Sequence, residues 1–203
     1  MKLPTKQDCY RMICEMNMLD HIAIHSMQVC RVATLLTEKL IEQGIDLNFD
    51  LIQAAALLHD ITKTRSLQTK ENHALTGGQL LADRGYPEVG HLVRQHVRLD
   101  EYPHPAIVSE AAIINYADKR VLHDKVVPLK TRLDYILEKY GKVPEHRQRI
   151  CRLWEKTKEL EEEIFRPLSL SPRNLTDVIN CEDRSLDVWE LQKLCGQLQV
   201  EIK

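Results

Sequence analysis

The chain has 203 residues with a formal net charge of −2, and hydrophobic residues make up 43% of it. These totals describe an ordinary globular protein with one domain, or one domain and an appendage. The balanced charge provides no global field to attract nucleic acid or an anionic membrane. No apolar run approaches the ~18 residues of a transmembrane helix, and the first residues lack the apolar core of a signal peptide. Six cysteines without a C-x-x-C pair then predict reduced thiols in a cytoplasmic protein.

Hydrophobic periodicity predicts helices along nearly the whole chain. A stripe with three- and four-residue steps covers residues 22–40 and ends before Gly44. Asn48 or Asp50 can cap the next helix, whose residues 51–58 are nearly all apolar. We therefore expect that helix to be buried on every side.

The remaining pattern is also helical, and no strand is predicted. Further helices are expected at residues 71–84, from 87 through 96, at about 106–122 and at 129–140, with a loop carrying Pro103 and Pro105. A long charged amphipathic helix should follow Pro144, then a turn in RPLSLSPRNL, then a last helix near 185–200. The sequence thus predicts an all-α fold with a core at 1–141 and a helical extension at 142–203, which packs on the core, covers the site or pairs in a homodimer.

A His-Asp dipeptide ends the most apolar helix. A buried carboxylate such as Asp60 needs a partner or a proton, and a metal ion is the strongest such partner. Imidazole and carboxylate ligands suit Zn, Fe, Mn or Ni better than Ca. The alternative is a plain helix end, where His59 meets the helix dipole and Asp60 pairs with Lys63 or Arg65. A second dipeptide, His123-Asp124, follows no long apolar run and is interpreted as a solvated helix end.

Four more residues of ligand type recur at helical positions. His25 lies mid-helix, His73 in a first turn, His96 near a helix end, and Asp118 behind a mostly apolar turn. Each alone is more often a surface residue than a ligand. Together with the His-Asp dipeptide they place ligand-type residues on five helices, which indicates one shared site.

This ordered H…HD…H…H…D pattern resembles the HD-domain superfamily of metal-dependent phosphohydrolases, and more closely its HDIG-like bacterial branch. The matching stretches span roughly residues 20–125: HSMQVCRVA, AAALLHDITK, ENHALTGGQLL, YPEVGHLVRQH and NYADKRV. The resemblance implies a helical bundle in which one metal ion is held by His25, His59, Asp60 and Asp118. It implies a second ion on His73 and His96 with Asp60 bridging, so two divalent ions (Fe, Mn, Ni, Zn or Co) are favoured over one.

The chain departs from the family pattern at two places. Thr62 stands where the HDIG label has Gly, which puts the subgroup in question more than the site. Gln95-His96 stands where the family often has paired His, which puts the second metal in question.

Two neighbouring histidines compete with the chosen ligands. His91 precedes His96 by five residues, about 140° around a helix, so only one of them can face the site. His96 is preferred because it is nearer the helix end. His21 lies one turn before His25 on the same face, and the Ser-x-x-Val context favours His25.

The implied chemistry is hydrolysis at phosphorus. Divalent ions lower the pKa of a bound water and so supply hydroxide for in-line attack near neutral pH. Asp60 is catalytic as the bridging ligand, and Lys63 is assigned to phosphate binding or leaving-group stabilisation. Weaker phosphate-binding candidates are Arg65, Arg94, Arg98, Lys119 and Arg120.

The substrate class follows from the same resemblance. We expect a small phosphorylated substrate, such as a dinucleoside polyphosphate, a cyclic dinucleotide or a nucleoside monophosphate. Two alternatives stay open: a non-catalytic HD-fold regulatory or binding module, and a di-iron HD-type oxygenase.

Overall fold

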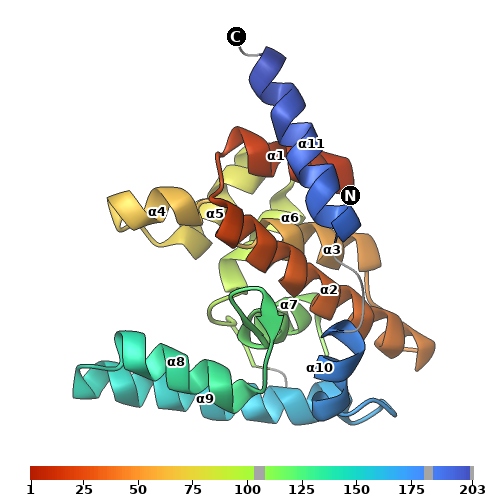
Figure 1. Ribbon diagram of the computed structural model, residues 1–203. Helices are drawn as coiled ribbons and strands as arrows, with labels where there is room; N and C mark the ends of the chain where they lie inside the picture. The colour runs from red at the N-terminus through yellow and green to blue at the C-terminus, as the bar shows by residue number, and fades with distance from the viewer. Residues whose placement is uncertain (103–107, 181–184, 202–203) are drawn as a thin grey trace.

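The computed structural model describes residues 1–102, 108–180 and 185–201, and these residues are mostly helical (Figure 1). The N-terminal part contains α1 (Lys6–Glu15), α2 (Asp20–Glu42), α3 (Phe49–Leu58), α4 (Lys63–Thr69), α5 (His73–Asp83), α6 (Pro87–Gln95) and α7 (Glu110–Lys119). The C-terminal part contains β1 (Val121–Leu122), β2 (Lys125–Val126), α8 (Leu129–Tyr140), α9 (Pro144–Phe165), α10 (Pro172–Asn180) and α11 (Ser185–Glu201). The all-α fold class is confirmed. The expected loop at Pro103 and Pro105 lies outside the described residues.

Helix α3 forms the centre of the hydrophobic core. The Asn48 side chain accepts a hydrogen bond from the Leu51 amide and caps its N-terminus, as expected from the sequence. Helices α1, α2, α6 and α7 all pack against it. Its residues 51–58 are buried except Gln53, because neighbours cover it on every side. This arrangement brings the His-Asp dipeptide after α3 into the interior.

Helices α5 and α6 lie backbone to backbone. A Cβ atom added at Gly78 would lie 2.7 Å from the Gly90 carbonyl oxygen, and one added at Gly90 would lie 2.3 Å from the Gly78 carbonyl oxygen. Only glycine permits this approach. The close packing brings the first residue of α5 next to the last turn of α6, where His73 and His96 lie.

Two elements differ from the expectation. Helix α7 ends at Lys119, and a short antiparallel hairpin follows, with Val121 paired to Val126 and Leu122 to Lys125. His123 therefore lies in a hairpin turn with a φ of 57°, and its interpretation as a helix end is wrong. Helix α4 was not predicted, because it has no buried residue and so no apolar stripe.

The C-terminal helices pack on the rest of the chain. Helices α8 and α9 run side by side as an arm in Figure 1. The later residues of the α9 apolar stripe, Trp154, Leu160 and Ile164, are buried, and the Trp154 indole donates a hydrogen bond to the Leu129 carbonyl oxygen. This stripe packs within the chain, against α7 and α8, and a homodimer stays a prediction. Part of the expected RPLSLSPRNL turn is instead the start of α10. The division at residue 141 stays a prediction.

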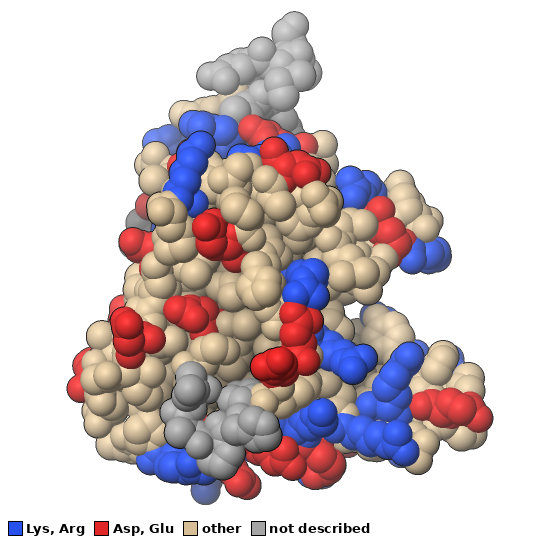
Figure 2. Space-filling model, turned by 180° about the vertical axis from the view of Figure 1, so that it is seen from behind, with Lys and Arg blue, Asp and Glu red and all other residues tan. Residues whose placement is uncertain are grey.

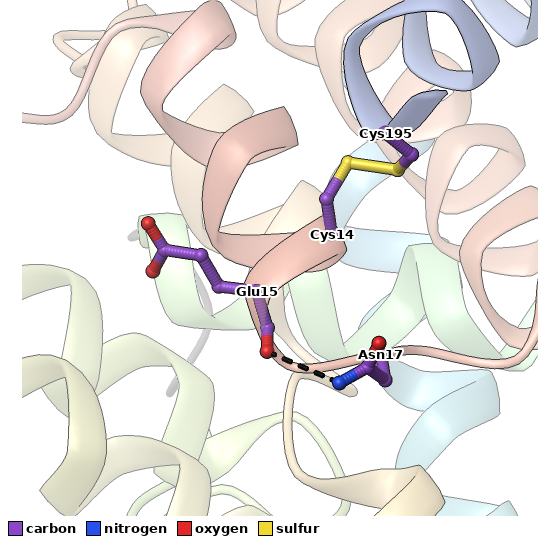
Figure 3. The surroundings of a disulfide bond; sticks show 4 residues. All are labelled: Cys14, Glu15, Asn17 and Cys195. Atoms are coloured by element: carbon purple, nitrogen blue, oxygen red, sulfur yellow. Dashed lines mark hydrogen bonds between the residues drawn. A yellow bond between two sulfur atoms is a disulfide. The ribbon is translucent and has the colours of Figure 1, made fainter. Parts of the chain in front are cut away.

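A disulfide bond joins Cys14 on α1 to Cys195 on α11 (Figure 3). The expectation of six reduced thiols is thus wrong for this pair, while Cys9 and Cys151 are free thiols. The two half-cystines are 181 residues apart, so no local spacing could have revealed them. Because disulfides are typical of oxidising compartments, this bond weakens the thiol argument for a cytoplasmic location.

Both signs of charge are mixed over the face shown in Figure 2. Helix α4 and the α8–α9 arm project on the same side of the molecule (Figure 1). Figure 2, seen from behind, shows a notch in the surface between them. Among the described residues, no helix is both long and apolar enough to cross a bilayer.

Candidate metal centre

Five helices bring the predicted residues into one cluster. His25 lies on α2, His73 begins α5, and Asp118 lies in the last turn of α7. His59 caps the C-terminus of α3 and is followed by Asp60, and His96 caps the C-terminus of α6. All six predicted ligands therefore come together.

The cluster has two halves that meet at His59. In the first half, Asp118 Oδ1 lies 3.1 Å from His25 Nε2 and 3.8 Å from His59 Nε2. In the second half, Asp60 Oδ1 lies 3.1 Å from His73 Nε2 and 3.6 Å from His96 Nε2. Asp60 Oδ2 lies 3.6 Å from His59 Nε2 and connects the halves.

Backbone carbonyl groups orient three of the imidazole rings. The Nδ1 atoms of His59 and His96 lie 2.8 Å and 2.7 Å from the carbonyl oxygens of Ala56 and Val93. Because a carbonyl oxygen only accepts, each Nδ1 must carry the proton and donate it. His25 Nδ1 donates in the same way to the His123 carbonyl oxygen at 3.0 Å. With Nδ1 held by a carbonyl oxygen, the Nε2 atom of each ring faces the cluster, the arrangement found around metal-binding histidines.

The residues fit a metal ion. His59 Nε2 and Asp60 Oδ1 are buried without a hydrogen-bond partner, which is costly unless a ligand occupies the site. Two groups have donor atoms within 4.8 Å of one another: His25, His59 and Asp118, and His59, Asp60 and His96. Imidazole nitrogen with carboxylate oxygen is the donor set of zinc and of first-row transition metals.

The ionisation of the cluster also suits a cation. Burial lowers the pKa of His59 to about 4, so its ring is neutral at neutral pH. Burial also lowers the pKa of His73. Burial alone would raise the pKa of Asp60, but the charge interaction with His59 and the contacts of His73 and His96 outweigh it and hold the pKa well below its usual range. Burial alone would also raise the pKa of Asp118, but its contact with His25 and the charge of Arg132 outweigh burial and hold the pKa well below its usual range. His59 and His73 thus offer neutral nitrogens, and Asp60 and Asp118 offer ionised carboxylates.

Thr62 and Lys63, which follow the His-Asp dipeptide, both contact His73 in the second half of the cluster. The buried Thr62 hydroxyl donates to the His73 carbonyl oxygen at 2.9 Å and so holds the start of α5. The departure from the HDIG pattern therefore adds a contact to the site. Lys63 Nζ lies 3.1 Å from His73 Nε2 and 3.6 Å from Asp60 Oδ1.

The competing histidines lie elsewhere. His21 and His91 are both exposed, and the His91 ring contacts Gln95 Nε2 at 2.9 Å. The choice of His25 and His96 agrees with this geometry. The His123 side chain is exposed too, and only its carbonyl group reaches the cluster.

The weaker phosphate candidates are engaged by protein groups or lie on the surface. Arg65 and Arg94 form ion pairs with Glu71 and Asp100, and Arg98 is exposed. The Lys119 ammonium donates to two backbone carbonyl oxygens, and Arg120 is buried in a hydrogen-bond network with α9 and α10. In the described part of the chain, none of these five contacts a ligand atom of the cluster, although Lys119 donates to the His96 backbone carbonyl oxygen.

Sequence reasoning missed one cation beside the cluster. The Arg132 guanidinium, from α8, lies 4.0 Å from Asp118 Oδ1. No motif marks Arg132. Its only signal is a basic residue in the helix that follows the Asp118 segment.

Comparison with known families supports the resemblance noted from the sequence. A family model described as HD domain matches residues 22–121, which include all six clustered residues. The match supports assignment to the HD-domain superfamily, whose members are typically metal-dependent hydrolases. No curated protein and no solved structure matched the chain.

Proposed function

We propose that this HD-type domain holds one or two divalent transition-metal ions, two being favoured, and hydrolyses a phosphate ester or anhydride in a small substrate, a nucleotide by preference. The observation that carries the proposal is the pair of buried, unsatisfied ligand atoms, His59 Nε2 and Asp60 Oδ1, at the centre of the cluster. Burying them without a partner would cost on the order of several kcal/mol. A bound cation removes that cost.

The ligand set divides between the two halves. His25, His59, Asp60 and Asp118 would hold the first ion, and His73 and His96 the second, with Asp60 shared. The bound metal supplies a Lewis acid and an activated water. The contribution of the chain is to fix the ligand nitrogens through their carbonyl partners, so that little reorganisation is needed.

Lys63 would act on the substrate phosphate. Its side chain is 34% exposed, and its ammonium group already lies at the edge of the cluster. A lysine at this place can neutralise charge on a phosphoryl oxygen or on the leaving group.

Metal analysis and a nucleotide panel test the proposal together. We expect purified protein to contain transition metal, and metal-loaded protein to release phosphate or nucleoside monophosphate from some member of the panel. His59→Ala and Asp60→Ala should each lose bound metal and nearly all hydrolysis while the circular dichroism of the fold survives. Native metal content in either variant would contradict the assignment.

Two exposed histidines provide matched controls. His21→Ala and His91→Ala remove rings from the same two helices as His25 and His96 and should leave metal content unchanged. Bound metal without hydrolysis of any panel member would favour a non-catalytic module. Oxygen uptake by the iron-loaded protein would indicate an oxygenase.

A further inference from the structure

Arg132 is partly exposed and differs from Arg120, the buried arginine near the site. The Arg120 guanidinium is 1% exposed and is satisfied by oxygens of Tyr116, Val127, Glu161, Pro172 and Thr176. It has no donor left for a ligand. The Arg132 side chain is 16% exposed, yet in the described part of the chain its guanidinium makes no hydrogen bond. Its interactions are an ion contact at 4.0 Å with Asp118 Oδ1 and a cation–π contact with Tyr135.

A guanidinium group carries five donors in a planar fork that matches the oxygens of a phosphate. The Arg132 side chain is partly exposed, so these donors can be reached by a ligand that enters from solvent. Asp118 does not satisfy them, because the Arg132 guanidinium lies 4.0 Å from Asp118 Oδ1, which is beyond hydrogen-bond distance. The donors of Arg132 are therefore available to a ligand at the edge of the cluster.

Charge favours an anionic ligand there. Asp60 and Asp118 supply two negative charges, and Lys63 and Arg132 supply two positive ones. These four charges cancel. Each divalent ion that the cluster binds would therefore add two positive charges with no side-chain charge left to balance them. A phosphate group restores that balance.

The placement of the two cations suits a substrate held between them. Lys63 contacts the half of the cluster that contains Asp60, and Arg132 contacts the half that contains Asp118. They come from α4 and α8, the elements on either side of the notch in Figure 2.

We propose that Arg132 binds a non-bridging oxygen of the substrate phosphate, opposite Lys63, so that α8 completes a site whose other residues lie within residues 22–121. This inference rests on the proposed function. It assigns a substrate contact to a helix outside the segment that matches the HD domain model.

Titration of metal-loaded protein with inorganic phosphate tests the inference. Arg132→Ala should keep the wild-type metal content and weaken phosphate binding by about 10- to 100-fold, as expected for loss of charge-assisted hydrogen bonds. Arg132→Lys keeps the charge but loses the planar fork of donors, so its phosphate affinity should lie between those of the wild type and Arg132→Ala. If the Ala variant does not fold, Arg132→Lys is compared with the wild type instead. Lys130→Ala, on the same helix and 83% exposed, should bind phosphate like the wild type.

The other outcomes distinguish the role of Arg132 from the proposed function. Phosphate affinity within about twofold of wild type in Arg132→Ala would overturn the role of Arg132 and leave the proposed function intact. Loss of metal in that variant would also overturn it, because Arg132 would then position Asp118. A wild-type protein that takes up no metal would overturn the proposed function and this inference together.

Discussion

His25 Nδ1 lies 3.0 Å from the carbonyl oxygen of His123, a residue 98 positions later in the chain. The contact fixes the His25 ring so that its Nε2 faces Asp118. The hairpin β1–β2 supplies this carbonyl, and the backbone of His123 adopts a φ of 57° to do so. A backbone group of the second His-Asp dipeptide thus supports a ligand of the site, although its side chain does not.

We expect His123→Ala to be nearly neutral for metal content and hydrolysis, because the carbonyl group remains. Histidine adopts a left-handed backbone more readily than alanine, so the free energy of unfolding should fall by about 1 kcal/mol or less. His123→Gly avoids that penalty and is the matched variant. A loss of metal like that of Asp60→Ala would show that the His123 side chain is a ligand.

Lys63 and a second metal ion should compete for one place. The ammonium group lies 3.1 Å from His73 Nε2, where a second cation would also bind. Lys63→Met should therefore tighten binding of the second ion while lowering turnover, since the phosphate contact is lost. His73→Ala or His96→Ala should instead lower occupancy toward one ion. Calorimetric metal titration separates the two effects, and saturation of the wild type at one ion would rule out the two-metal site.

The metal-free protein should lose stability as the pH falls. The pKa of His59 is lowered from 6.5 to about 4 in the folded state, so the unfolded chain binds the proton more tightly. Stability is therefore full above about pH 6.5 and falls toward pH 4, by on the order of 3 kcal/mol for this group. The low pKa values of Asp60 and Asp118 act in the same direction at lower pH, because their contribution is lost as the carboxylates become protonated.

Denaturant unfolding of protein freed of metal with a chelator, between pH 4 and 7, measures how the free energy of unfolding changes with pH. His59→Asn should show a shallower dependence, and His146→Asn, at an exposed position, should match the wild type. An unchanged slope in His59→Asn would mean that other groups cause the pH dependence.

Much of the fold was predictable because its helices carry periodic apolar stripes and clear end signals. Asn48 caps α3 and Gly141 follows α8, as the sequence indicates. The hairpin was not predictable, because strands of two residues contain no alternation to detect. Helix α4 was missed because it buries nothing.

The six candidate ligands were predictable from their order in the sequence. The residues that contact these ligands and hold them in place were not. Thr62 departs from the family pattern, yet its hydroxyl holds the start of α5. Arg132 reaches Asp118 only because α7 ends early and the hairpin turns α8 back toward it. Such contacts depend on tertiary packing, which sequence spacing does not encode.

Glu161 should stabilise the junction between α9 and α7. Its carboxylate accepts hydrogen bonds from Tyr116 and from the buried Arg120, two residues after Asp118. Glu161→Ala would leave that guanidinium charge without its counterion and should lower the free energy of unfolding by about 1–3 kcal/mol. Glu155→Ala, exposed on the same helix, should change it by less than about 0.5 kcal/mol. Equal values for the two variants would contradict a structural role for the Arg120 network.

A chain ending at Gly141 should be much less stable than the full chain. It would lack α9, whose Phe165 packs on Tyr116, and both helices α9 and α10, whose oxygens on Glu161, Pro172 and Thr176 satisfy Arg120. It would also lose the disulfide bond that ties α11 to α1. If soluble, the truncated protein should still bind metal, because all six proposed ligands precede residue 119, but it should bind hydrophobic dyes and unfold at lower temperature. A truncated protein that is fully stable and monomeric, binds metal and yet lacks activity would show instead that residues 142–203 belong to the substrate site.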